Sequence, residues 1–375
     1  MTKTAPIDGN TAAPFESVAD AFRLNFEEGL ELGAHFAVFI DGEPVVNLWG
    51  GHADRERQAP WTEDRLACVY SSGKAVVALL VARAVSDGLL DYDAPVAAYW
   101  PEFAAAGKEG ITLADALSHQ AGLVGIAEEM PPEEWLDREK MSARIAAMAP
   151  LFPPRSASGY SPQLIGLIAN ELLTRVTGKT IGQALRSMEG GGLQIFCGMD
   201  GEEADRTVFM PKPPHAPDLG PLTELKSIAF LKPWSAPARV SREAWMAAEL
   251  PASNMHCNAA SLARIVHPFA NDGKQADGEP VIDPAVVGAA LKERMRGDDL
   301  VLPFELAWSA GLMSNINGHF GPSETAYGHA GFGGSCVVVD PARRLSAAYV
   351  MSKMSPYLVG DPRAVRLLEA VYGAL

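Results

Sequence analysis

Short apolar segments bounded by polar turn residues occur near both ends of the chain. Asp41-Gly42 separates two such segments near the N-terminus, and this residue pair is typical of a tight turn between antiparallel strands. Asp340-Pro341 begins a similar turn near the C-terminus. We expect strands from both ends to join one antiparallel sheet. The expected strands cover residues 35–40, 44–49, 335–339 and 346–351.

Other segments carry apolar residues every three or four positions, which is the period of a helix with one buried face. Residues 75–81 are apolar throughout, so their helix is expected to be buried. Gly178 follows another such segment and is a typical C-cap. The expected helices cover residues 15–30, 72–86, 113–119, 164–177 and 362–372.

The stretch from residue 210 to 237 is rich in proline. Proline removes a backbone donor and disfavours regular structure, so this stretch predicts a long irregular segment. Such segments often form lids or the walls of binding sites. A plain surface insertion is the alternative.

Composition excludes several classes of partner. The chain has 375 residues, 48% apolar content and a formal net charge of −15. Nucleic acids and anionic membranes attract clustered lysine and arginine, so neither is expected as a partner. The N-terminus has no apolar core of a signal peptide, and no run of about 18 apolar residues predicts a membrane span. We expect a cytoplasmic protein.

The cysteines and histidines lack the spacing of a metal site. The four cysteines show no Cys-x-x-Cys pair, and the eight histidines show no His-x-His or His-Glu-x-x-His motif. We therefore expect no metal site and no disulfide framework.

Ser71 and Lys74 stand at the start of the buried helix. Residues three positions apart share one helix face, so the lysine can lie beside the serine hydroxyl and help to remove its proton. Ser72 is the weaker candidate because Ala75 stands three residues after it. The alternative is structural: a serine that caps the helix and a solvated lysine.

Two further motifs carry possible chemistry. Tyr160 lies just before the apolar helix at residues 164–177, where its phenol can point into a cleft and act as a general base. The alternative is a half-buried tyrosine with a satisfied hydroxyl. Residues 328–335, Gly-His-Ala-Gly-Phe-Gly-Gly-Ser, precede a strand, and their glycines allow a ligand to approach the backbone. A tight β-connection with a solvated histidine explains them equally well.

These motifs, in this order, resemble the serine β-lactamase and penicillin-binding-protein fold. The match is closest to family VIII carboxylesterases and class C β-lactamase-like hydrolases. It rests on residues 70–74 (Tyr-Ser-Ser-Gly-Lys), 160–162 (Tyr-Ser-Pro) and 329–331 (His-Ala-Gly). Residues 87–96 and 111–123 are similar to the family's connecting segments.

The resemblance implies an α+β (α/β) fold of the β-lactamase/transpeptidase type. Its antiparallel sheet would be built from both termini and flanked by helices, with a helical domain beside it. We expect residues 1–78 and 195–375 to form the sheet domain. Residues 79–194 would form the mainly helical domain, with the active site in the cleft between the two.

The resemblance also implies roles for residues in a two-step reaction that needs no metal or organic cofactor. Ser71 would be the acylated nucleophile, Lys74 would assist its activation, and Tyr160 would be the general base. The backbone N–H groups of Ser71 and Phe332 would form the oxyanion hole. His329 would take the place of the lysine in the Lys-Thr-Gly motif of β-lactamases and line the cleft.

The expected substrate is a small, neutral ester. Gly331 and Trp308 are further candidates for substrate binding. Pro162 stands where the family often has asparagine, and a neutral histidine at 329 is a poorer partner for a carboxylate than lysine. Both departures favour short-chain or aryl esters over β-lactams. Acyltransferase, amidase or D-aminopeptidase and weak β-lactamase activity remain alternatives, as does a silent ligand-binding module. The oligomeric state stays open.

A competing nucleophile is Ser309. Its context, Ala-Trp-Ser-Ala-Gly at residues 307–311, imitates the elbow of α/β-hydrolases, and His329 follows it. That fold also needs an acidic residue between serine and histidine and a series of βαβ units, which the sequence does not indicate. Gly178-Lys179-Thr180 ends like a phosphate-binding loop but lacks the upstream glycine.

Overall fold

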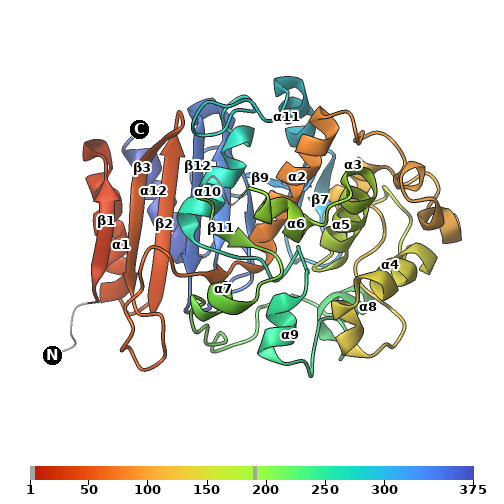
Figure 1. Cartoon of the computed structure of the whole chain (residues 1–375), viewed down its shortest axis with the longest axis horizontal. Helices are drawn as coiled ribbons and strands as arrows, with labels where there is room; N and C mark the ends of the chain where they lie inside the picture. The colour runs from red at the N-terminus through yellow and green to blue at the C-terminus, as the bar shows by residue number, and fades with distance from the viewer. Residues whose placement is uncertain (1–4, 189–191) are drawn as a thin grey trace.

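The computed structural model describes residues 5–188 and 192–375, and residues 1–4 and 189–191 of the two predicted domains lie outside it. A nine-stranded antiparallel sheet forms one side of the molecule (Figure 1). Strands from both ends of the chain meet where β2 pairs with β12, which confirms the predicted sheet. The order is β1 (Ile7–Thr11), β3 (Glu43–Gly51), β2 (Gly33–Ile40), β12 (Leu345–Met351), β11 (Cys336–Asp340), β10 (Tyr327–Ala330), β9 (Met313–Ser314), β8 (Glu305–Trp308) and β7 (Met295–Asp298).

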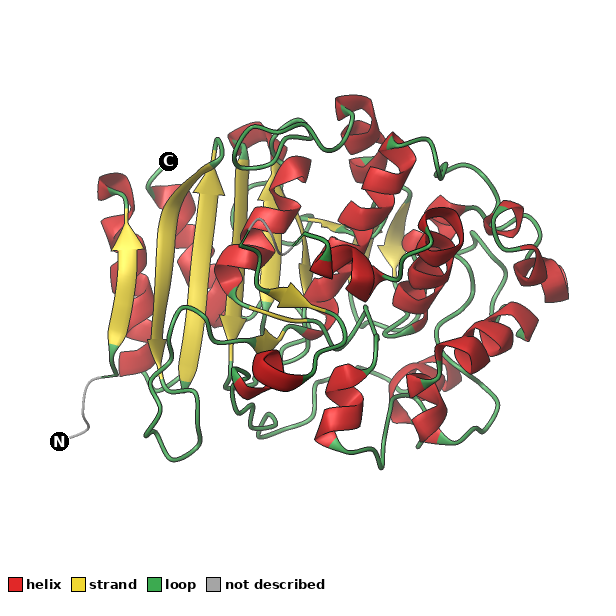
Figure 2. Ribbon diagram, viewed as in Figure 1, coloured by secondary structure: helices red, strands yellow, loops and turns green. Residues whose placement is uncertain are grey.

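Alternate residues of the central strands enter two separate cores, because successive side chains in a strand point to opposite faces. Phe36 and Val38 pack against α1 (Glu16–Glu27) and α12 (Pro362–Gly373). Ala37 and Phe39 join the larger core, which contains α2 (Lys74–Ser86) and α10 (Ala259–Val266). Helices therefore cover both faces of the sheet, as Figure 2 shows.

Of the remaining helices, α3 (Leu113–Leu117), α4 (Arg138–Ala147) and α5 (Leu164–Thr177) lie on the other side of the molecule, beyond α2 (Figure 1). α5 begins and ends at the predicted residues, and Gly178 follows it in the left-handed conformation with φ 74°. The helices are α3 (Leu113–Leu117), α4 (Arg138–Ala147), α5 (Leu164–Thr177), α6 (Ile181–Arg186), α7 (Gly201–Asp205), α8 (Glu224–Lys226), α9 (Arg242–Ala247) and α11 (Pro284–Leu291). A small second sheet joins β4 (Ala67–Cys68), β6 (His256–Cys257) and β5 (Ile195–Phe196).

Two of the predicted boundaries concern α2. The predicted helix at 72–86 begins as a 3-10 turn, Tyr70–Gly73, before α2 starts at Lys74. The predicted division after residue 78 falls inside α2, which packs against α5 as well as α10.

The proline-rich stretch is irregular except for α8 and the π-helical turn Ser227–Leu231. None of the helices formed by residues 5–188 and 192–375 is long and apolar enough to cross a bilayer.

Candidate active site

Ser71 lies in the 3-10 turn that leads into α2. The residue before it, Tyr70, has φ 46°, a conformation that side chains rarely adopt. From Lys74 to Ala82 every residue of α2 is buried, so the helix fixes the position of its first turn within the core. The nucleophile candidate is thus held on a rigid element at the wall of a cavity.

Three functional groups meet at this turn. Lys74 Nζ lies 2.8 Å from Ser71 Oγ and 3.0 Å from Tyr160 Oη, as a donor to both oxygens. The Tyr160 hydroxyl in turn donates to Ser71 Oγ at 2.7 Å. The structure therefore brings together the three residues that the sequence singled out for catalysis.

Lys74 is buried among uncharged partners. Besides Ser71 and Tyr160, the carbonyl oxygens of Pro162 at 2.9 Å and Ala252 at 3.1 Å lie within hydrogen-bond distance of its Nζ, so these four acceptors share its N–H groups. Burial disfavours the ammonium form and lowers the pKa of Lys74 well below its ordinary value of 10.5. A neutral amine at this position can accept a proton.

Tyr160 is fixed through its backbone. Its N–H donates to Asp299 Oδ1 at 3.0 Å, and the same oxygen accepts the N–H groups of Val301 and Leu302. Burial raises the pKa of the Tyr160 phenol above its ordinary value of 10, and the hydrogen bond with Ser71 opposes this shift. Burial therefore favours the protonated phenol, and the role of Tyr160 as general base stays a prediction.

Aromatic side chains support Tyr160 from behind. The Trp308 ring stacks on it at 6.0 Å between centroids, and His119 lies at 4.9 Å. His119 Nδ1 accepts the N–H of Ser161, which orders the same loop. Trp308 and His329 are both fully buried.

The positions of His329 and Trp308 differ from the sequence prediction. Neither is among the described residues that line the cavity at Ser71. His329 Nδ1 contacts the carbonyl of Ala330, and burial together with Lys74 lowers the pKa of His329 to about 3. Its neighbour Ala330 lines the cavity instead, because adjacent strand residues face opposite sides. Trp308 and His329 support Tyr160 and do not form the cavity wall.

Gly331 acts through its small size. A Cβ atom at this position would lie 2.1 Å from the carbonyl oxygen of Val69. The close approach allows Ser335 Oγ to donate to that oxygen at 2.8 Å, and Ser72 Oγ contacts Ser335 Oγ at 3.1 Å. Ser72 is therefore a structural residue that ties the start of α2 to the turn after β10.

Ser309 is excluded as a nucleophile by its surroundings. It is fully buried, and its hydroxyl donates to the carbonyl of Leu312 at 3.1 Å. It directly follows Trp308, the last residue of β8, and it is not among the described residues that line the cavity at Ser71.

The cavity beside Ser71 has a volume of about 700 Å³ and a mostly apolar wall. Phe332 contributes to it, with its ring 5.5 Å from that of Tyr70. Among the described residues that line it, Asp218 is the only charged one. The wall also includes apolar residues of the proline-rich stretch: Ala216, Pro217, Leu219, Leu222, Ala229, Phe230, Leu231 and Ala236.

Sequence reasoning missed the roles of two contributors to this site. Asp299 and His119 hold the Tyr160 loop, and no pattern in the chain marks them for that role. Gln163 lines the cavity, where its Oε1 accepts the Ser253 hydroxyl at 2.7 Å.

Elsewhere, a hollow of about 810 Å³ near Glu63 contains none of the predicted site residues. Within residues 5–188 and 192–375, no group of three His, Cys, Asp or Glu side chains could hold a metal ion.

Several known proteins are similar to this chain in sequence and in fold. The chain is 32% identical to Esterase/beta-lactamase LipL of Mycobacterium tuberculosis over 367 residues, or 92% of this chain and 83% of that protein. A penicillin-binding protein homolog from Caulobacter crescentus superposes with a TM-score of 0.96 and 47% identity, over 99% of this chain and 100% of that one. A family VIII carboxylesterase superposes with a TM-score of 0.92 and 38% identity, over the same shares.

These similarities confirm the family resemblance and the fold predicted from the sequence. Residues 22–371 match the Beta-lactamase family, so the match covers most of the chain. The chain belongs to the Beta-lactamase family.

Proposed function

We propose that this protein is a serine carboxylesterase that hydrolyses short-chain or aryl esters through an acyl-enzyme on Ser71. The coarser assignment, a serine hydrolase with the β-lactamase fold, follows from the family and from relatives named as esterases. One observation carries the finer proposal: Lys74 Nζ lies within 3.0 Å of both Ser71 Oγ and Tyr160 Oη at the edge of an apolar cavity.

In the acylation step, Ser71 Oγ attacks the ester carbonyl carbon and loses its proton. Neutral Lys74 accepts this proton, because burial lowers its pKa, and the Tyr160 phenol shares hydrogen bonds with both groups. The backbone N–H groups of Ser71 and Phe332 are the proposed donors to the oxyanion. The Lys74–Tyr160 pair then returns the proton to the leaving alkoxide as the carbon–oxygen bond breaks.

Deacylation repeats the sequence with water as the nucleophile. The Lys74–Tyr160 pair removes a proton from water, which attacks the acyl carbon, and then returns the proton to Ser71 Oγ. This step releases the carboxylic acid and restores the free serine. Chain residues alone supply every proton transfer in this scheme.

The cavity wall favours a neutral substrate. A carboxylate transferred into an apolar site without a positive partner loses hydration that nothing replaces. Asp218, the charged residue among the described wall residues, has the sign that repels an anion. At Pro162 the carbonyl is already engaged by Lys74, and the residue has no side-chain donor for an amide substrate. Esters therefore fit better than carboxylate-bearing β-lactams.

Hydrolysis of 4-nitrophenyl acetate by wild type, Ser71→Ala and Ser309→Ala tests this proposal. We expect Ser71→Ala to lose at least about 10³-fold in kcat/KM, as removal of a catalytic nucleophile does. Mass spectrometry of quenched wild type should find the acyl group on the peptide that contains Ser71. Full activity of Ser71→Ala would disprove the nucleophile, and an inactive wild type would support a silent binding module.

A further inference from the structure

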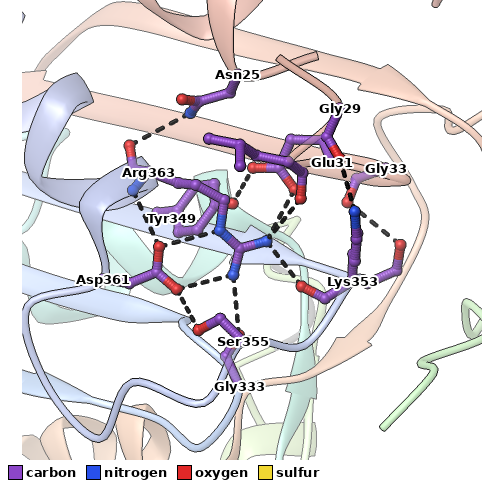
Figure 3. Close-up of polar contacts among 12 residues, drawn as sticks. Asn25, Gly29, Glu31, Gly33, Gly333, Tyr349, Lys353, Ser355, Asp361 and Arg363 are labelled. Carbon is purple, nitrogen blue, oxygen red and sulfur yellow. Dashed lines mark hydrogen bonds and ion pairs between the residues drawn. The ribbon is translucent and has the colours of Figure 1, made fainter. Parts of the chain in front are cut away.

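A cluster of buried charges lies behind the turn that carries Phe332. Arg363, the second residue of α12, binds Asp361 through Nε and Nη2 at 3.0 and 2.8 Å (Figure 3). Its Nη1 binds Glu31 at 3.2 Å, and Tyr349 donates its hydroxyl to the same carboxylate. All three charged side chains are at most 5% exposed. Such a cluster is costly to bury unless its geometry is well satisfied.

This cluster is in direct contact with the turn. Arg363 Nη2 donates to the carbonyl oxygen of Gly333 at 3.0 Å, and the N–H of Ser355 donates to the same oxygen at 2.9 Å. A Cβ atom on Gly334 would lie 2.2 Å from Asp361 Oδ2. The glycines after Phe332 therefore rest directly on the Arg363–Asp361 pair.

The opposite side of the turn is held by the segment that carries Ser71 and leads into α2. Ser335 Oγ donates to Val69, and Ser72 Oγ contacts Ser335 Oγ. Within the turn, the N–H of Gly331 donates to Ser335 at 2.8 Å. Phe332 thus lies between two sets of contacts, one to the segment before α2 and one to the start of α12.

The same arginine holds a second part of the cavity wall. Its Nη1 donates to the carbonyl of Lys353 at 2.7 Å, and Ser355 Oγ donates to Asp361. Leu358 and Val359, which lie in the same connection between β12 and α12, line the cavity. One guanidinium therefore holds in position both the turn at Phe332 and the segment with Leu358 and Val359 that lines the cavity.

We propose that Arg363 is a positioning residue for the reaction, which through Gly333 holds the Phe332 N–H and side chain in place at the cavity. The inference rests on the proposed function, in which that N–H binds the oxyanion. A catalytic donor displaced by about 1 Å can lower the rate by as much as 10²-fold. Only a guanidinium has enough donors for Asp361, Glu31, Lys353 and Gly333 together.

Arg363→Lys tests this role, because lysine keeps the charge and loses the forked geometry. Arg366→Lys is the matched control: Arg366 lies on the same helix, and its hydrogen bonds at 2.8 Å join α12 to Asn25 of α1 and to Glu28, the residue that follows α1. We expect Arg363→Lys to lower kcat for 4-nitrophenyl acetate about tenfold or more, with KM nearly unchanged. Arg366→Lys should stay within about twofold of wild type. Equal effects of the two variants on kcat, each measured where it is fully folded, would overturn the proposal.

Hydrogen exchange separates this inference from the proposed function. We expect the amides of residues 331–335 to exchange faster in Arg363→Lys than in wild type and Arg366→Lys. Unchanged exchange would overturn the inference even in an active enzyme. An inactive wild type with the expected exchange pattern would instead disprove the esterase and leave the structural link in place. If Arg363→Lys does not fold, Asp361→Asn replaces it, because asparagine also caps α12 and weakens the same pair.

Discussion

The Tyr160 hydroxyl lies 2.7 Å from Ser71 Oγ, although 89 positions separate the two residues in the chain. Two anchors produce this contact. The first is the rigid start of α2, and the second is Asp299, which binds the Tyr160 N–H from the loop after β7. The contact between Ser71 and Tyr160 therefore depends on the whole fold. The contribution of each side chain at the site can be tested by a separate substitution.

Tyr160→Phe should lower kcat/KM for a neutral nitrophenyl ester by about 10²-fold, the usual scale for loss of a proton-transfer group. The phenylalanine ring can keep its stacking on Trp308, so we expect little loss of stability. Tyr92→Phe is the control: it removes another buried hydroxyl, one without a hydrogen-bond partner among the described residues. An active Tyr160→Phe enzyme would exclude the phenol from the mechanism.

Lys74 should set the pH dependence. The amine becomes active as it loses its proton, so kcat/KM should rise from acid to alkaline pH. Burial lowers the pKa of Lys74, so half of the maximal rate should be reached well below pH 10.5. The measurement is kcat/KM for 4-nitrophenyl acetate between pH 5 and pH 10. A flat profile from about pH 6 to 9 would contradict this assignment.

Lys74→Arg separates proton transfer from charge. A guanidinium keeps the positive charge but does not give up its proton in proteins. If Lys74 acts as the base, this variant should lose at least about 10²-fold in kcat/KM at every pH. Substantial activity in Lys74→Arg would mean that a positive charge beside Ser71 is sufficient.

Local sequence predicted the parts of this site that depend on a single element. The spacing of Ser71 and Lys74 places them on one helix face, and α5 has the predicted bounds because Gly178 ends it. The family resemblance added the contact between Ser71 and Tyr160, because its order of motifs implies a shared cleft.

The face of β10 could not be predicted in the same way. His329 and Ala330 are adjacent in the strand, and their side chains point to opposite sides. The pairing of β10 with β11, His329 opposite Val337, sets which of them faces the cavity. That pairing places Ala330 at the cavity and His329 behind Tyr160. Asp299 and His119 escaped prediction because only tertiary contacts give them a role.

The apolar cavity should discriminate against charge on the acyl group. 4-Nitrophenyl butyrate and the mono-4-nitrophenyl ester of succinic acid have acyl chains of the same length, but only the second carries a carboxylate. We expect kcat/KM to favour the butyrate by at least about tenfold, because burial of the carboxylate costs free energy. Asp218→Asn should reduce the ratio of the two kcat/KM values by only about twofold. Asp218 is exposed, so solvent screens its repulsion of the substrate carboxylate. Equal rates for both esters, or rapid hydrolysis of nitrocefin, would contradict a preference for neutral esters.

Glu31 should make stability depend on pH. Burial raises the pKa of Glu31 from 4.5 to about 7, with Arg363 and the Tyr349 hydroxyl opposing the shift and Asp361 adding to it. Between these two values the folded protein holds a proton that the unfolded chain releases, so the free energy of unfolding falls as the pH rises from about 4.5 to about 7.

Glu31→Gln should remove this contribution, because glutamine does not titrate and still accepts the Tyr349 hydroxyl. Denaturant unfolding of wild type and variant at pH 5 and pH 8 gives the measurement. Wild type should lose more stability between the two pH values than the variant, by on the order of 2 kcal/mol. Glu28→Gln changes a more exposed carboxylate, directly after α1, that pairs with Arg366, and this variant should follow the wild-type curve. Parallel curves for wild type and Glu31→Gln would mean that Glu31 is already ionised at pH 5 in the folded protein.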